Sequence, residues 1–320
     1  MTTSASPHAD PVGAESPDAT RPDPTRADAS IMTVLGQVKA ESLATILPSE
    51  HVLANLSHVD GTDPSTVDRI RAAAAFGDSL LHAPLTIDRL GDITLGAPNL
   101  ENRSLADAEL AASELSLFGA AGGSLVVDAT PRDLGRSPRG LAGLAERTGV
   151  AIVMGSGRYR GEAGATDATA LADEIVADLT HGTDGIRAGV IGRLGVLDPE
   201  DAADRAVLVA SARASARTGA PVIVTHPGVD RIDAVLTTLL GAGASANRIA
   251  VTGCGTVAAS HDSLLALARR GVFVLFDRLG RQTSVYTTWD DGDLVAALTA
   301  LLPEHGHQVL LSPASPSASI

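Results

Sequence analysis

From residue 120 onward, short runs of Val and Ile alternate regularly with longer segments rich in Ala, Leu and Arg. The runs typical of strands are 124–130, 150–156, 187–195, 221–226, 249–254, 272–277 and 307–312. The segments typical of helices include 200–219, 260–271 and 289–303, and Gly219 is suited to end the first of these. Continuous apolar strands separated by amphipathic helices predict a parallel sheet built of βα units.

An eighth strand is predicted upstream, at 51–56, and eight βα units indicate a (β/α)8 barrel, a fold of about 250 residues. The 320 residues of the chain are enough for one such barrel. An open doubly wound sheet is the alternative, but no G-x-G-x-x-G follows the first strand, which disfavours dinucleotide binding. We expect a single barrel over 31–320, with 57–120 inserted after the first strand and partly helical at 101–119.

The two ends of the chain are expected to lie outside the barrel's regular elements. Residues 1–30 contain no apolar run and are rich in Pro, Ala, Ser and Asp, which predicts a disordered tail. No signal-peptide core and no run of about 18 apolar residues is present, so we expect a cytoplasmic protein without a membrane span. Residues 312–320 are rich in Ser and Pro, so the helix that normally follows the last strand is expected to be missing. An apolar patch left there would suit a homo-oligomer or a complex with a related chain.

Charge and composition exclude several functions. The formal net charge is −14, whereas a duplex nucleic-acid binder needs a basic stripe and an anionic membrane attracts basic segments. Cys254 is the only cysteine, which excludes an internal disulfide and a cysteine-based zinc cluster. Lys39 is the only lysine, so no lysine is available on the later strands for a Schiff base or a carbamate.

Several motifs at the ends of the predicted strands are specific. They are 126-VVDATPRDLGR-136, 185-GIRAGVIG-192, 218-TGAPVIVTH-226 and 276-FDRLG-280. On these motifs the chain resembles the phosphotriesterase family of the amidohydrolase superfamily, in its lactonase-like branch, over roughly 33–314. The resemblance implies a barrel with two divalent metals at its C-terminal mouth. Such metals polarise an ester, lactone, amide or phosphoester and supply a hydroxide.

The metal ligands that the resemblance implies are mostly absent. The family pattern has a His-x-His pair on the first strand, a bridging Lys or Glu on the fourth, a His on the fifth and sixth, and an Asp on the eighth. In this chain only His51 and His226 match. The lost positions are occupied by Ser49, Gly192 or Arg193, Gly253 and Ala314.

Two vestigial histidines are too few for the family's metal centre. Catalytic zinc usually has three protein ligands, whereas each metal here would keep one, and Arg193 would add a fixed positive charge beside them. The sequence therefore predicts a degenerate site with no cofactor. The alternative is zinc or another divalent metal, weakly bound.

Other residues of the old pocket are candidates for ligand binding. Tyr159 and Arg278 match positions that face the substrate in lactonase-like members. Arg193 either neutralises acidic groups such as Glu50 or Asp277, or binds a small anionic molecule. Cys254 is either a thiolate nucleophile or inert packing.

Three functions stay open at this point. The first is a pseudoenzyme, acting as a binding or regulatory subunit, with a small anion held at the mouth. The second is a metal-independent enzyme in which His226 and Arg193 are catalytic and Tyr159, Arg278, Arg193 and Cys254 bind the ligand. The third is a metal-dependent hydrolase of esters, lactones, amides or phosphoesters, completed by a partner chain or by unforeseen ligands.

Overall fold

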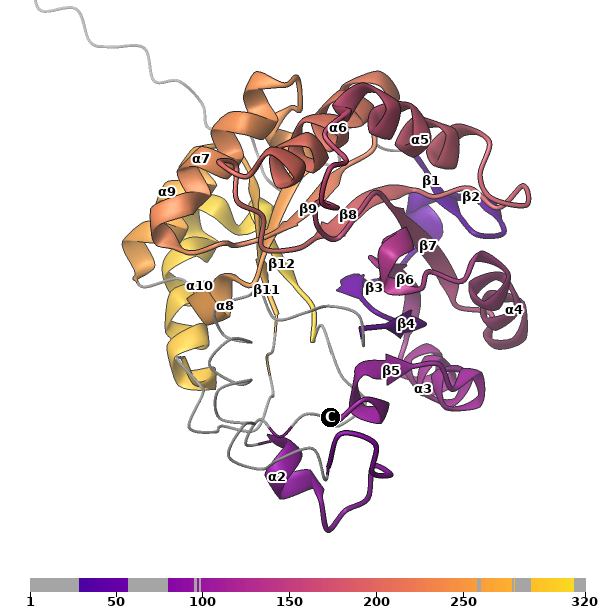
Figure 1. Ribbon diagram of the computed structural model, residues 1–320. Coiled ribbons are helices and arrows are strands. Elements are labelled where there is room, and N and C mark those ends of the chain that lie inside the picture. The colour runs from indigo at the N-terminus through magenta and orange to yellow at the C-terminus, as the bar shows by residue number, and fades with distance from the viewer. Residues whose placement is uncertain are drawn as a thin grey trace, which may run out of the picture.

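The computed structural model describes residues 29–56, 80–94, 97, 99–257, 260–277, 279 and 289–313, and its centre is an eight-stranded parallel sheet (Figure 1). In sheet order the strands are β3 (Thr45–Glu50), β6 (Gly123–Asp128), β7 (Ala151–Ser156), β8 (Val190–Leu194), β9 (Val222–Thr225), β10 (Ile249–Thr252), β11 (Phe273–Phe276) and β12 (Val309–Leu311). Every neighbouring pair is parallel, as the apolar runs predict. The predicted (β/α)8 barrel is confirmed.

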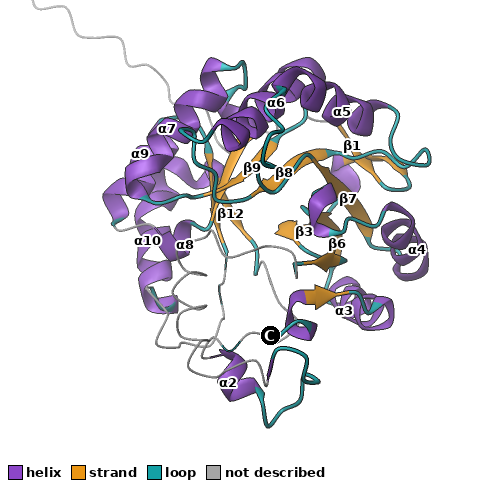
Figure 2. Ribbon diagram, viewed as in Figure 1, coloured by secondary structure: helices purple, strands orange, loops and turns teal. Residues whose placement is uncertain are grey.

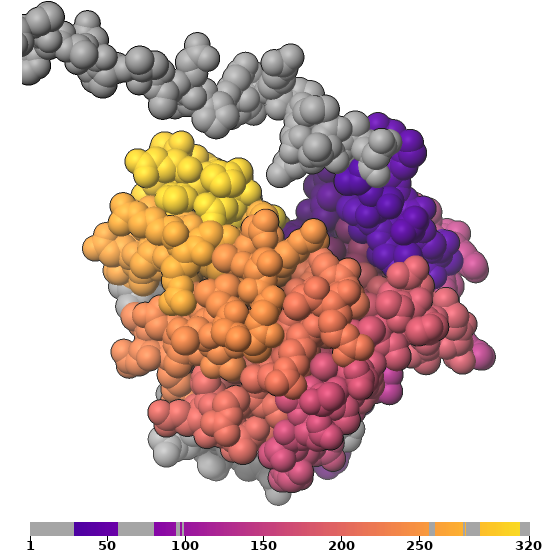
Figure 3. Space-filling view, turned by 90° about the horizontal axis from the view of Figure 1, so that it is seen from above, coloured from indigo at the N-terminus to yellow at the C-terminus, as the bar shows by residue number. Residues whose placement is uncertain are grey.

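The first and last strands, β3 and β12, meet through a serine. The Ser49 amide donates to Ser312 Oγ at 3.2 Å, and the Ser312 hydroxyl donates to the carboxylate of Glu50. Figure 3 shows the N-terminal segment in indigo and the C-terminal segment in yellow facing each other across a notch. The sheet is therefore nearly closed into a barrel, and hydrogen bonds of Ser312 link its two edges.

Helices form a layer around the strands (Figure 2). The longer ones are α3 (Ala108–Ala120), α4 (Pro138–Thr148), α5 (Ala168–Thr180), α6 (Ala202–Thr218), α7 (Val229–Gly241), α9 (His261–Arg269) and α10 (Asp291–His305). Their ends follow from local chemistry: the Asp201 side chain accepts the first free amides of α6, and Gly219 ends it at φ +76°. The three helices predicted at 200–219, 260–271 and 289–303 are confirmed as α6, α9 and α10.

The remaining elements are short. They are the strands β1 (Ser30–Thr33), β2 (Gly36–Lys39), β4 (Ala54–Asn55) and β5 (Ser104–Leu105), the helices α2 (Leu90–Thr94) and α8 (Cys254–Val257), and the 3-10 turns η2 (Ala40–Ser42), η4 (Glu101–Arg103), η5 (Arg132–Leu134), η6 (Ala246–Arg248) and η7 (Gly306–Gln308). The β1–β2 hairpin precedes the barrel, and the antiparallel pair β4–β5 follows its first strand.

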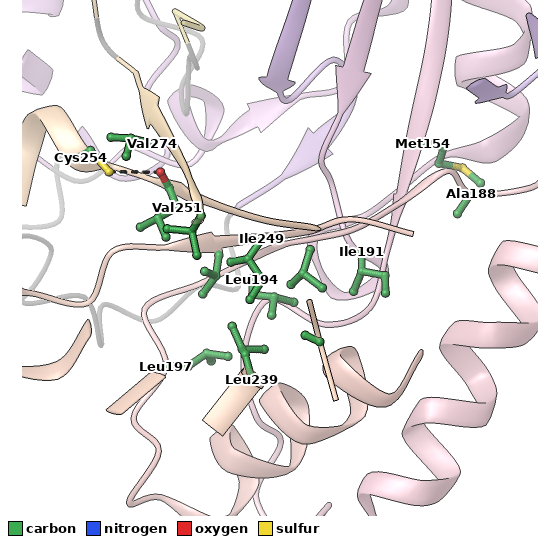
Figure 4. Packing of buried hydrophobic residues seen from close by; sticks show 14 of the residues in the cluster. Met154, Ala188, Ile191, Leu194, Leu197, Leu239, Ile249, Val251, Cys254 and Val274 are labelled. Carbon is green, nitrogen blue, oxygen red and sulfur yellow. Dashed lines mark hydrogen bonds between the residues drawn. The ribbon is translucent and has the colours of Figure 1, made fainter. Parts of the chain in front are cut away.

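The core has two layers because successive side chains of each strand point to opposite faces of the sheet. Inside the barrel lie Leu125, Val153, Val190, Ile223 and Ala250, with Ile31 and Val38 of the β1–β2 hairpin packed against them. The larger outer layer fills the space between the strands and the helices (Figure 4). It is built almost wholly from Ala, Val, Leu and Ile, since only 2% of the residues are aromatic.

The first barrel strand differs from the sequence prediction. It spans Thr45–Glu50 instead of 51–56, and His51 follows its last residue. Pro48 argues against a central strand in a sequence reading, because proline lacks an amide donor. The structure accommodates Pro48 in a stretch where the β3–β6 register shifts, between Leu47 and Glu50.

Residues 104–105 form β5 and 108–120 form α3, so the helix predicted at 101–119 begins later than expected. Residues 1–28, 57–79 and 314–320 lie outside the described part, so the disordered tail, the domain boundaries and the missing last helix stay predictions. None of the helices in the described ranges combines the length and the apolar character of a membrane span. The cytoplasmic location also stays a prediction.

Candidate functional site

Buried polar residues collect where the barrel strands end. They are Ser49, Glu50, Asp128, Thr130, Ser156, His226, Thr252, Asp277 and Ser312. Each lies at, or within two residues of, the carboxyl end of its strand, whereas the middles of the strands are apolar. Burying polar groups is costly unless they are paired, and the C-terminal mouth is where barrels of this kind place their sites. This rim is the candidate functional site.

Arg193, on β8, crosses the rim toward the next strands. Its Nε donates to Thr225 Oγ1 at 3.1 Å, and its Nη2 donates to Asp277 Oδ2 at 3.3 Å. The side chains of Arg193 and Asp277 are 12% and 2% exposed, so this is a largely buried ion pair. The structure thus pairs Arg193 with Asp277, one of the two acids that the sequence analysis considered. Glu50 contacts Ser312 instead.

Asp277 directly follows β11 and is only half satisfied. Its Oδ2 accepts from Arg193 and from the Thr252 hydroxyl at 3.1 Å. Its Oδ1 is buried and has no hydrogen-bond partner among the described residues. Buried carboxylate oxygens are normally paired, so Oδ1 is an acceptor available to a ligand.

His51 belongs to a hydrogen-bonded chain at the start of the barrel. Its Nδ1 lies 2.9 Å from Thr130 Oγ1, and the Thr130 hydroxyl donates to Asp128. Burial, and then the charge of Arg193, lower the pKa of His51 to about 3, while burial raises the pKa of Asp128 to about 7. Because the Thr130 hydroxyl donates its one proton to Asp128, it accepts from His51 Nδ1–H.

His226, after β9, uses its ring differently. The Gly228 amide donates to His226 Nδ1 at 3.1 Å. Burial lowers the pKa of His226 to about 4, so the ring is neutral at pH 7 and carries its proton on Nε2. Neither nitrogen therefore offers a free lone pair to a cation.

Glycine conformations make two of the lost ligand positions, Gly192 and Gly253, unsuitable for side chains. Gly192 has φ +107° and Gly253 has φ +80°, both in the left-handed region that favours glycine. A Cβ on Gly192 would overlap the carbonyl oxygen of Ile223. Within the described ranges, no three His, Cys, Asp or Glu side chains lie together as a metal ion requires, and Ala314 is outside them. The described residues do not fit a two-metal centre.

The other predicted pocket residues lie in different surroundings. Tyr159 lines a cavity of about 670 Å³ together with Asp133, Arg158 and Glu174, and none of Arg193, His226 and Asp277 lines it. Arg278 is outside the described residues. The roles predicted for Tyr159 and Arg278 stay predictions.

Cys254 packs in the outer core. It is fully buried, and its Sγ contacts the Val251 carbonyl oxygen at 3.1 Å (Figure 4). Burial, and then the negative charge of Asp277, raise the pKa of this thiol. A thiol held protonated among Val and Leu side chains is a poor nucleophile, which favours the packing interpretation.

Three threonines of the site were missed by the sequence analysis. Thr130, Thr225 and Thr252 each supply a hydroxyl to the rim network. The available signal was a hydroxyl residue at or just beyond the end of an apolar strand, as in 222-VIVT-225 and 249-IAVT-252. Threonine is also a common strand residue, so the signal is weak on its own.

The parallel barrel and the polar rim at its C-terminal end place the chain among (β/α)8 barrel proteins. The model of the phosphotriesterase family matches residues 29–314, and the chain belongs to that family. Among curated relatives, the N-acetyltaurine hydrolase of Danio rerio is 30% identical over 269 residues, which cover 80% of this chain and 73% of the relative. The N-acetyltaurine hydrolase of Homo sapiens is 29% identical over 275 residues, covering 82% and 76%.

Solved structures give the same assignment. A resiniferatoxin-binding protein from Rhodobacter sphaeroides superposes with a TM-score of 0.78 at 30% identity, covering 90% of this chain and 82% of the other. The organophosphorus hydrolase of Deinococcus radiodurans superposes with a TM-score of 0.66 at 26% identity, covering 89% and 79%. The family resemblance read from the sequence is confirmed, and curated relatives of the chain are named as hydrolases.

Proposed function

We propose that this family member binds a small molecule through an anionic group at Arg193 and works without a two-metal centre. The observation that carries the proposal is the buried guanidinium of Arg193, bound to Thr225 and Asp277. An arginine is always charged and has five N–H donors, which suits it to hold a carboxylate, sulfonate or phosphate.

A binding or regulatory role is the first candidate, because the described residues do not supply the ligands of a metal-hydroxide centre. His226 Nδ1 already accepts a hydrogen bond and Nε2 carries the proton, and Gly192 and Gly253 have backbones that favour glycine. Metal-independent chemistry with His226 as a catalytic group would require His226 to act through Nε2–H, as a hydrogen-bond donor. Arg193 would then hold the anionic group of the substrate.

A hydrolase is the second candidate, and the names of the relatives favour it. N-acetyltaurine combines a sulfonate, which Arg193 could hold, with an amide bond. Activity of the metal-dependent type would need cation ligands from a partner chain or from residues outside the described part.

One pair of measurements separates the two candidates. The purified chain is equilibrated with Zn²⁺ or Mn²⁺, dialysed and submitted to elemental analysis, and hydrolysis of N-acetyltaurine is assayed with each metal. We expect well under one metal ion per chain and no metal-dependent turnover. A stoichiometric metal that survives dialysis, together with turnover, would favour the hydrolase.

A second experiment tests the anion site itself. Small carboxylates and sulfonates are titrated by calorimetry into the wild type, Arg193→Gln and the control Arg270→Gln, whose guanidinium pairs with Asp233 on the surface. Binding should weaken at least about tenfold in Arg193→Gln and be unchanged in the control, since a charged hydrogen bond contributes about 1.5–3 kcal/mol. Equal binding to all three proteins would contradict the proposal.

A further inference from the structure

The carboxylate of Asp277 has one oxygen that is buried and unused. Asp277 is 1% exposed, and Oδ1 has no partner among the described residues although Oδ2 has two. Leaving a buried acceptor unpaired costs about 1–3 kcal/mol, and more for a charged group. A hydrogen-bond donor brought by a ligand would remove this cost.

The guanidinium of Arg193 is also incompletely used. Nε and Nη2 donate to Thr225 and Asp277, while Nη1 has no partner in the part of the chain that the structure describes. The ion pair is a single contact of 3.3 Å, whereas Arg–carboxylate pairs are frequently bidentate. Within the described residues, Arg193 thus keeps the N–H donors of Nη1 without a partner, and Asp277 keeps the acceptor Oδ1 without one.

We propose that the Arg193–Asp277 pair selects a small zwitterion: an acidic group bound by Arg193 Nη1 and an ammonium bound by Asp277 Oδ1. The inference rests on the proposed anion binding at Arg193 and makes Asp277 the residue that determines specificity. Because the two side chains touch, the ligand's own charged groups must be separated by only one or two carbons, as in an α- or β-amino acid or an aminosulfonate.

Charge balance points to the same class of ligand. Arg193 and Asp277 carry opposite charges, so the pair is neutral as a unit. A simple anion would leave one uncompensated negative charge in a largely buried place, in a protein whose formal net charge is already −14. A zwitterion brings no net charge, and each of its groups meets the opposite charge at short range.

The test compares two sulfonates of nearly the same shape. Taurine and propane-1-sulfonate differ in an ammonium against a methyl group, and both are titrated by calorimetry into the wild type, Asp277→Asn and the control Asp233→Asn. In the wild type taurine should bind at least about tenfold more tightly. Asp277→Asn should reduce the preference to about twofold or less. Asp233→Asn, in an exposed pair with Arg270, should keep it.

A third ligand tests the role of Asp277 in the wild type alone, so the result does not depend on whether Asp277→Asn folds. N,N,N-trimethyltaurine keeps the positive charge but has no N–H, so it should bind the wild type at least about tenfold more weakly than taurine. If propane-1-sulfonate binds the wild type as tightly as taurine and loses affinity in Arg193→Gln, the zwitterion inference is overturned and the anion site stands. If no sulfonate binds in an Arg193-dependent way, both proposals are overturned.

Discussion

At the scale of single residues, the glycines at positions 192 and 253 and the histidines His51 and His226 set the chemistry of the barrel mouth. Gly253 has a backbone φ of +80°, which residues with a side chain rarely adopt. His226 already accepts a hydrogen bond on Nδ1. The backbone at Gly253, as well as the missing side chain, therefore disfavours a metal ligand at this position. Restoring one ligand by substitution should not restore the site.

Gly253→His tests this point. We expect a loss of about 1 kcal/mol or more in the free energy of unfolding, because a non-glycine residue is strained at positive φ, and no gain of zinc. Chemical denaturation and elemental analysis measure the two effects. Gly143→Ala, in α4 with open space around its Cβ, is the control and should be neutral or slightly stabilising. A stable Gly253→His variant with one zinc per chain would refute the argument.

His226 gives a second prediction, on pH. Its pKa is about 4 in the folded protein and 6.5 as the reference, so between these values the unfolded chain binds a proton that the native state does not. The contribution of His226 to stability is therefore complete above pH 6.5 and decreases as the pH falls toward 4, by about 3 kcal/mol in all.

His226→Gln should make stability less sensitive to pH across this window, which urea unfolding at pH 7.5 and pH 5 would measure. The exposed His181, bonded to Thr180, provides the control variant His181→Gln. An unchanged difference in stability between the two pH values in His226→Gln would show that the histidine does not titrate as described.

At the scale of elements, a single carboxylate on α5 fixes the loops beside the site. Asp178 accepts from Arg136 at 2.9 Å, from Arg132 at 3.0 Å and from the Ser156 hydroxyl at 2.9 Å. Burial opposes ionisation of Asp178, but the hydrogen bond and charge of Arg136 outweigh it and hold the pKa of Asp178 below its usual value. The loop after β6 and the end of β7 are thereby tied to one helix.

Asp178→Ala should lower the free energy of unfolding by about 3–5 kcal/mol, because it leaves the buried guanidinium of Arg136 without a carboxylate to balance its charge. Asp173→Ala is the matched control on the same helix, since its pair with Arg217 is exposed and contributes about 1 kcal/mol or less. Equal losses in the two variants, measured by chemical denaturation, would contradict the assignment of Asp178 as a buried anchor.

How well an element could be predicted depended on whether its own residues determine it. Helix α6 is set locally by Asp201 at its start and Gly219 at its end, and the sequence predicted it to within two residues. Strand β3 contains Pro48, which disfavours a strand when the sequence is considered alone, so the strand was predicted at 51–56. In the structure, contacts with the neighbouring strands β6 and β12 stabilise β3 at Thr45–Glu50. The β1–β2 hairpin was not predicted, because its Ile31 and Val38 only acquire a partner once the barrel interior exists.

At the scale of the whole molecule, the site exists only because distant strands converge. Arg193 and Asp277 are 84 residues apart, and Ser49 and Ser312 are 263 residues apart. The sequence identified Arg193, His51 and His226 as candidates through the family resemblance. It could not show that Asp277 keeps a buried oxygen without a partner among the described residues, or that His226 Nδ1 already accepts a hydrogen bond, because these properties arise from packing.

Closure of the barrel at β3 and β12 leads to the last prediction. Ser312 joins the Ser49 amide and the Glu50 carboxylate across the only break in the sheet within the described strands. Ser312→Ala removes a buried partner from both groups and should lower the free energy of unfolding by about 1–3 kcal/mol. It should also speed hydrogen exchange at the Ser49 amide, because the edge of the barrel would open more often.

Two control variants, Ser312→Thr and Ser263→Ala, show whether the effect of Ser312→Ala comes from the loss of this particular hydroxyl. Ser312→Thr retains the hydroxyl and should recover most of the protection at Ser49, while Ser263→Ala removes an exposed hydroxyl in α9 and should change stability by less than about 0.5 kcal/mol. If the Ser49 amide exchanges as slowly in Ser312→Ala as in the wild type, packing of β3 and β12 alone closes the barrel. The rim that carries Arg193 and Asp277 would then keep its shape without the serine link.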